Sequence, residues 1–274
     1  MNHLLRDLAP ITDDAWAAID EEARETLKEI LAARKLVDFA GPLGWQAYAV
    51  DLGITRNLRG GPATGVEARQ RQAQPLVEFR VPFEVPRDKI EAVARGAEQV
   101  PFDEVVEAAR RIGLAEDKAI FHGYDAAGIT GIMSGSDHKN LTLSADYEKY
   151  PAAVAEAMTM LREGGIGGPY AIALGPRCYK GLMTTVSKGG YPVMRHVQDL
   201  LDGPMVWAPG IDGACVMSTR GGDYKLIVGQ DFSIGFLSAS DDKVRLYLEE
   251  SFTFRNLEPG AAVALSYGRA RAKS

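Results

Sequence analysis

Residues 47–81 read AYAVDLGITRNLRGGPATGVEARQRQAQPLVEFRV, and this stretch limits which folds the chain can form. It consists of two weakly alternating, strand-like arms around a tip that contains Gly60-Gly61-Pro62 and Gly65. Its apolar content is too small to hold a core, and a hairpin of about 35 residues without a core is uncommon inside a compact domain. We therefore expect the stretch to be disordered or to lie across another chain.

The charge of the chain argues against several classes of partner. The stretch 47–81 carries five arginines and three acidic residues, which could suggest RNA, but base stacking needs interleaved aromatic residues and 49–78 contains none. The whole chain has a net charge of −6, so neither nucleic acid nor an anionic membrane is an expected partner. Its 274 residues, 46% of them hydrophobic, suffice for one large domain or two smaller ones.

Outside this arm, hydrophobic periodicity predicts a mixture of helices and strands. A helix begins at the capping residue Thr12, carries Arg34 and Lys35 at its far end, and stops before Gly41-Pro42. The stretch 243–254 alternates as a strand with one apolar face, which only Glu250 interrupts. The other expected elements are helices over 101–118, 150–163, 178–187 and 194–201, and a strand over 169–174.

No sequence pattern indicates a catalytic or metal site. GGIGGPY at 164–170 starts like a dinucleotide-binding loop, but Tyr170 stands where the third glycine belongs, and a helix stop is favoured. The four histidines lack partners three or four residues away, so no metal-binding helix face is expected. Carboxylates on helix faces are interpreted as solvated surface. Cys178 and Cys215 are interpreted as buried thiols of a reduced, cytoplasmic protein.

Eight blocks of sequence, spread over nearly the whole chain, carry a family resemblance. They are RDLAPIT (6–12), AARKLVDFAGPLGW (32–45), QPLVEFRVPFEV (74–85), IFHGY (120–124), GGPYAIAL (167–174), GGYP (189–192), RGGDYKLIVGQDFSIGF (220–236) and VRLYLEESFTF (244–254). In this order, and without large insertions, they resemble the encapsulins, the linocin-like shell proteins of bacterial nanocompartments.

The resemblance implies an α+β fold, that of the tailed-phage major capsid proteins. Such a fold has a peripheral domain with a long spine helix, an axial domain that points at the symmetry axes, and an extended loop that reaches a neighbouring subunit. The loop would bury its surface between subunits, which would explain its poor core. The implied division is a peripheral domain in 1–46, 82–129 and 223–256, an extended loop in 47–81, and an axial domain in 130–222 to which 257–274 returns.

The resemblance also implies a shell subunit rather than an enzyme. Such subunits self-assemble into icosahedral cages of about 60 or more copies. The cages enclose a cargo enzyme, commonly a ferritin-like iron-storage protein or a dye-decolorising peroxidase, whose C-terminal targeting peptide docks on the inner wall. By position, the dock would consist of Arg34, Asp38, Phe39, Asp231, Phe232, Ile234, Gly235 and Phe236, and the five-fold pore would be rimmed by Lys188, Gly189, Gly190 and Tyr191.

Two departures from the family pattern limit what is expected. No lysine lies between Lys35 and Lys89, so the loop lacks the side chain that a phage-type isopeptide cross-link would use. PRDKI at 86–90 lacks the tryptophan that some members place near a flavin, so no cofactor is expected. Two alternatives stay open: a phage or prophage capsid protein of the same fold, and a soluble hydrolase-like or protease enzyme that depends on Cys178.

Overall fold

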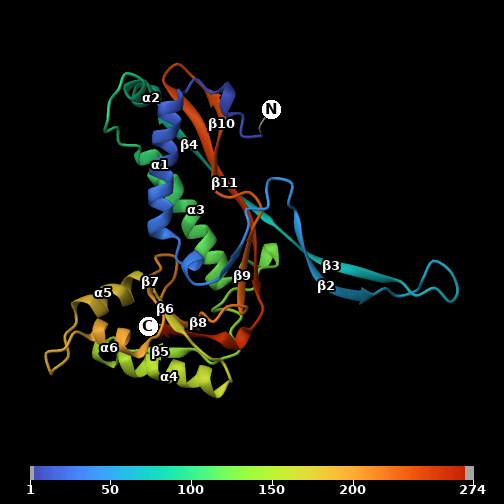
Figure 1. Ribbon diagram of the computed structural model, residues 1–274, viewed down its shortest axis with the longest axis vertical. Coiled ribbons are helices and arrows are strands. Elements are labelled where there is room, and N and C mark those ends of the chain that lie inside the picture. The colour runs from blue at the N-terminus through green and yellow to red at the C-terminus, as the bar shows by residue number, and fades with distance from the viewer. Residues whose placement is uncertain (1–2, 269–274) are drawn as a thin grey trace, which may run out of the picture.

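The computed structural model describes residues 3–268 and consists of two lobes, with a hairpin that projects away from the body (Figure 1). Each lobe is built on its own sheet and carries its own helices. The long strand β11 (Lys243–Asn256) belongs to the first lobe and leads toward the second. The C-terminal tail predicted beyond residue 268 lies outside the described residues.

The sheet of the first lobe has the strand order β1-β9-β11-β10, and β4 pairs antiparallel with residues 243–252 of β11. Helix α3 packs against β4 and β11, and α1 packs against α3. The bounds are β1 (Asp38–Ala40), β4 (Val77–Pro86), β9 (Tyr224–Val228), β10 (Ser233–Ala239), α1 (Asp13–Ile30), α2 (Arg87–Ala94) and α3 (Asp103–His122).

Helix α1 is shorter than its sequence pattern predicts. The pattern extends to Lys35, but the helix ends at Ile30, so the predicted end is wrong. The cause is a tertiary contact: the carboxylate of Asp117 on α3 accepts the backbone N–H groups of Ala32 and Ala33, each at 2.9 Å. These two bonds hold the backbone after α1 in a 3₁₀ turn that faces α3.

Strand β11 is buried on both faces from Leu246 to Phe254, so the expectation of a single apolar face is wrong. Leu248 faces the core between the sheet and the helices. On the opposite face, Glu249 is covered by His3 at 3.2 Å and by Arg80 at 2.6 Å. The side chains of His3, from the N-terminal segment, and Arg80, from β4, therefore shield the second face of β11 from solvent. The periodicity of the strand does not predict this contact.

The second lobe packs three helices against a sheet of order β5-β12-β8-β6-β7 (Figure 1). The helix predicted over 150–163 is confirmed with the same bounds. The elements are β5 (Leu141–Leu143), β6 (Tyr170–Leu174), β7 (Met205–Trp207), β8 (Ala214–Ser218), β12 (Ala262–Tyr267), α4 (Tyr150–Glu163), α5 (Pro176–Thr184) and α6 (Val193–Leu200).

The arm is an ordered hairpin of β2 (Ala49–Asn57) and β3 (Arg69–Pro75), which pair antiparallel with each other (Figure 1). Its large apolar side chains are exposed on the subunit: Tyr48 at 82%, Ile54 at 59% and Val66 at 48%. A hairpin that leaves such groups in water presents a surface that another chain can cover.

Candidate functional site

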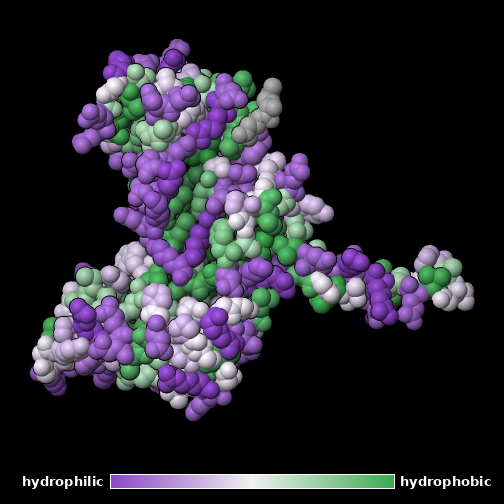
Figure 2. Space-filling view, in the orientation of Figure 1, coloured by the Kyte–Doolittle hydropathy of each residue, from purple (hydrophilic) through white to green (hydrophobic). Residues whose placement is uncertain are grey.

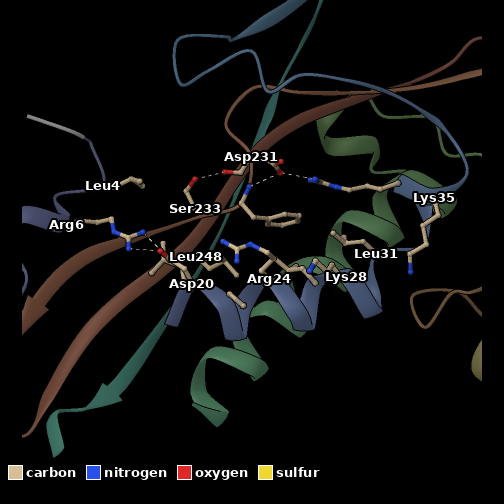
Figure 3. A pocket seen from close by; sticks show the side chains of 15 residues that line it. Leu4, Arg6, Asp20, Arg24, Lys28, Leu31, Lys35, Asp231, Ser233 and Leu248 are labelled. Atoms are coloured by element: carbon tan, nitrogen blue, oxygen red, sulfur yellow. Dashed lines mark hydrogen bonds and ion pairs between the residues drawn. The ribbon is translucent and has the colours of Figure 1, made fainter. Parts of the chain in front are cut away.

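A groove of about 670 Å³ runs along α1, between this helix, the N-terminal segment and strands β10 and β11 (Figure 3). Figure 2 shows an apolar strip beside the hydrophilic outer surface of α1. The apolar side chains that line the groove are Leu4, Ala23, Leu27, Leu31, Phe232, Ile234 and Leu248, and the polar ones are Arg6, Asp20, Arg24, Lys28, Arg34, Lys35, Asp231 and Ser233.

The floor of the groove follows from the helical spacing of α1. Ala23, Leu27 and Leu31 recur every four residues, which places them along one edge of the helix. Helix α1 lies close to α3 because Gly113 has no side chain: a Cβ there would lie 3.2 Å from the Leu27 side chain. The close approach fixes the helix edge against which β10 and β11 complete the groove.

Arg34 holds the end of the groove together. Its guanidinium donates to Glu116 at 2.6 Å, to Asp231 at 2.8 Å and to Glu250 at 3.3 Å. It also lies 4.5 Å from the centre of the Phe232 ring, within cation–π range. One arginine thereby connects α3, β11 and the loop that enters β10, and it fixes the groove wall at Asp231 and Phe232.

The interpretation of helix-face carboxylates as solvated surface is wrong for Glu116 and Asp117 of α3, which are both fully buried. Glu250, which interrupts the apolar face of β11, is fully buried as well. Burial and, next to it, the neighbouring Glu116 carboxylate raise the pKa of Glu250 well above its usual range, and Arg34 offsets this only in part. Burial raises the pKa of Asp117 to about 7, against the opposing effect of its two backbone N–H donors.

The substitution Glu250→Gln is expected to stabilise the protein relative to wild type by an amount that grows as the pH rises toward the raised pKa of Glu250. Because the folded-state pKa of Glu250 is raised, its stabilising contribution is complete at low pH and is lost as the pH rises through that pKa. Glutamine has a similar shape and does not titrate. Thermal unfolding of purified shells between pH 6 and 9 measures the difference, and identical pH profiles for both proteins would refute the assignment.

The structure brings half of the predicted dock together. Arg34, Asp231, Phe232 and Ile234 line the groove, and Arg34 and Asp231 form an ion pair. Ile234 is only 2% exposed, so it contributes to the floor rather than to an open surface.

The other four predicted dock residues lie outside the groove. Asp38 lines a separate pocket of about 200 Å³ and accepts the N–H of Gly222 at 2.6 Å. Phe39 follows it on β1, and the centre of its ring lies 5.3 Å from the Arg34 guanidinium, so it contacts the end of the groove without lining it. Gly235 makes room for the ring of Tyr247, which a Cβ would overlap, rather than for the backbone of a visiting chain. The N–H of Phe236 donates to the carbonyl of Leu4 at 2.8 Å.

Sequence reasoning missed the basic side of the groove. Arg24, Lys28 and Lys35 line it, as does Arg6 from the N-terminal segment (Figure 3). A signal was present, because Arg24 and Lys28 are four residues apart and adjoin the apolar row of Leu27 and Leu31. The contribution of Arg6 could not be predicted from the local sequence, because the N-terminal segment reaches the groove only in the folded protein.

The loop predicted to rim a pore joins α5 to α6 in the second lobe, and all four of its predicted residues are exposed. Gly190 has a φ of 82°, which a glycine adopts readily. The ring of Tyr191 stacks on His196 at 4.6 Å, and its hydroxyl donates to Asp199 at 3.0 Å. These contacts tie Tyr191 to α6 and leave Lys188 and Gly189 in solvent.

Neither a metal cluster nor an activated thiol is present among the described residues. Within residues 3–268, no cluster of histidine, cysteine and carboxylate side chains is arranged to hold a metal ion. Cys178 and Cys215 are buried, unpaired thiols, and burial raises the pKa of both, that of Cys215 to about 12. A thiol with a raised pKa is a poor nucleophile.

In the part of the chain that the structure describes, no helix is both long and apolar enough to cross a bilayer.

Comparison with known proteins identifies the family. Residues 1–253 match the family model described as an encapsulating protein for peroxidase. The type 1 encapsulin shell protein of Rhodospirillum rubrum is 52% identical over 97% of this chain and 96% of its own length, and that of Mycobacterium tuberculosis is 43% identical over 97% of this chain and 100% of its own.

Solved structures confirm the predicted fold class. The virus-like particle of Pyrococcus furiosus superimposes with a TM-score of 0.63 at 18% identity, covering 91% of this chain and 98% of that one. The Gordonia phage Cozz structure gives 0.56 at 16% identity, covering 88% of each chain. At such identities, these similarities establish the α+β capsid fold alone. The relatives establish more: the chain belongs to the type 1 encapsulin shell protein family and is a structural subunit of a capsid-like cage.

Proposed function

We propose that the cage encloses a cargo enzyme and retains it through a C-terminal targeting peptide bound in the groove along α1. The groove carries this proposal, since it combines a continuous apolar floor with polar groups at its rim, as expected for a site that binds an extended or helical peptide. The description of the matching family as an encapsulating protein for peroxidase supports a peroxidase as the cargo. A ferritin-like iron-storage protein is the other candidate.

We also propose how the parts of the subunit are placed in the cage. The lobe with α3 is assigned as the peripheral domain, the lobe with α4 to α6 as the axial domain, and the arm as the extended loop that contacts a neighbouring subunit. Around 60 or more copies would close an icosahedral shell through identical interfaces. The loop of Lys188, Gly189, Gly190 and Tyr191 would rim the five-fold pore. Two free, buried thiols favour assembly in the cytoplasm.

The substitution Ala23→Phe is expected to leave shells assembled but to reduce retained cargo by at least about tenfold. Ala23 lines the groove floor and is only 4% exposed, so a phenyl ring there extends into the space that a peptide side chain would fill, and an unchanged midpoint of thermal unfolding shows that the core around it is kept. Mass spectrometry and gel densitometry of shells purified from the native host measure the cargo per subunit.

The matched control is Ala17→Phe, which places the same ring on an exposed position of the same helix. Ala17→Phe shells should contain cargo at the wild-type level. If Ala23→Phe shells are loaded as well as the wild type, the groove does not hold the cargo and the proposed function fails at this site.

A further inference from the structure

The groove is basic, although the chain as a whole is acidic. Five basic side chains line it against two acidic ones, in a chain whose net charge is −6. The basic residues are Arg6, Arg24, Lys28, Arg34 and Lys35, and the acidic residues are Asp20 and Asp231. Local charge of this sign, inside a partly enclosed site, favours a ligand that carries negative charge.

Both acidic side chains of the groove are already neutralised by the protein. Asp20 accepts two hydrogen bonds from Arg6, at 2.7 and 3.1 Å, and Asp231 accepts one from Arg34 at 2.8 Å (Figure 3). Neither of these arginines is free for a ligand, because Arg34 also serves Glu116 and Glu250. The positive charge that no carboxylate of the groove itself pairs with therefore belongs to Arg24, Lys28 and Lys35, at the edge of α1 and in the turn that follows it.

These three residues can exchange partners at little cost. Arg24 pairs with Glu21 and Lys28 with Glu25 on the exposed surface of α1, where side chains are 55–61% exposed and such ion pairs contribute little. Glu21 and Glu25 line a neighbouring groove and are not among the residues that line this one. Lys35 is exposed at the end of the groove.

The basic row runs beside the apolar row. Leu27 and Leu31 form the floor; Arg24 lies three residues before Leu27 and Lys28 three residues before Leu31, a spacing that makes side chains neighbours on a helix surface. A peptide that places apolar side chains on the floor would bring its neighbouring groups within reach of the basic row. A carboxylate there would make a charge-assisted hydrogen bond, whereas a lysine or arginine would meet like charge.

We infer that the groove selects a targeting peptide in which apolar residues are accompanied by a carboxylate, and that Lys28 and Lys35 with Arg24 determine this specificity. The inference rests on the proposed function of the groove. The carboxylate has two possible sources, an aspartate or glutamate side chain within the apolar segment or the terminal carboxylate of the cargo chain.

Competitive loading of cages tests the inference. Green and red monomeric fluorescent proteins are co-expressed with the shell, each with a designed tail of leucine, isoleucine, glycine and serine that ends in Gly-Ser-Gly-Ser. The tails differ in one central residue, which is aspartate, asparagine or lysine. A fourth tail contains asparagine and lacks the terminal extension, so that its own carboxylate lies next to the apolar segment. A tailless protein sets the background.

We expect the aspartate tail, the short tail or both to exceed the extended asparagine tail by at least about fivefold within the same shells, and the lysine tail to load least. The tail that wins identifies the source of the carboxylate. The triple variant Arg24→Gln, Lys28→Gln, Lys35→Gln should bring the ratios close to one. The matched control Lys149→Gln changes an exposed lysine of the other lobe and should leave the ratios unchanged.

Each remaining outcome overturns the inference. Equal loading of all tails above the tailless background would show that the groove binds apolar peptides without regard to charge, and the proposed function would stand. Loading of no tail above background would show that an apolar peptide with a carboxylate is not the ligand. The proposed function is then judged separately by the native cargo content of Ala23→Phe shells.

Discussion

Shortening the arm is expected to abolish the shell and leave a folded, unassembled subunit. The change replaces residues 52–72 by Asn-Gly, which closes Asp51 onto its cross-strand partner Ala73 through a two-residue turn. The removed segment carries Ile54, Leu58 and Val66, whose side chains are exposed on the subunit. Full burial of such side chains contributes about 1.5–3 kcal/mol each, and a closed shell repeats that contribution at every copy.

The body of the subunit does not depend on these residues, because both core clusters are formed by residues outside the deleted segment. Size-exclusion chromatography and negative-stain electron microscopy measure assembly, and circular dichroism measures the fold. A finer variant, Ile54→Asp, should weaken assembly, whereas the exposed polar change Gln70→Ser on the opposing strand should not. Normal shells from the shortened chain would show that the arm is dispensable for assembly.

Replacing Arg34 by alanine is expected to destabilise the protein by about 3–5 kcal/mol. The substitution leaves Glu116 and Glu250 in the core without the cation that both of them contact, and it frees Asp231 from the groove wall. The midpoint of thermal unfolding should fall by roughly 10 °C, and cargo should be lost as well. Differential scanning calorimetry of purified shells measures the first effect and gel densitometry the second.

A triple variant distinguishes the cost of leaving buried carboxyls without a cation from the other effects of shortening the Arg34 side chain. Arg34→Met combined with Glu116→Gln and Glu250→Gln removes the cation and both buried carboxyls together, and it should recover much of the lost stability. The recovered protein should still load cargo poorly, since Asp231 and Phe232 lose their contacts with the Arg34 guanidinium. If Arg34→Ala alone unfolds at the wild-type midpoint, the buried carboxyls do not depend on Arg34.

Much of the fold could be predicted from local pattern. The arm was recognisable because a long, glycine-tipped stretch with few apolar residues has no core of its own, and α4 was predicted with its observed bounds. The eight sequence blocks indicated the encapsulin family and the capsid fold, which the comparisons confirm. These features depend on residues close together in the chain, or on similarity spread along it.

Three features depend on contacts between distant segments and could be established only from the tertiary structure. The end of α1 is set by Asp117, 84 and 85 residues away from the backbone groups that it caps. The burial of Glu250 and Glu116 depends on Arg34 lying between strand and helix. Likewise, the basic side of the groove exists because the N-terminal segment and α1 meet β10 and β11. Composition and periodicity determine which residues favour a core, but the partner of a buried charge is determined only when distant segments come together.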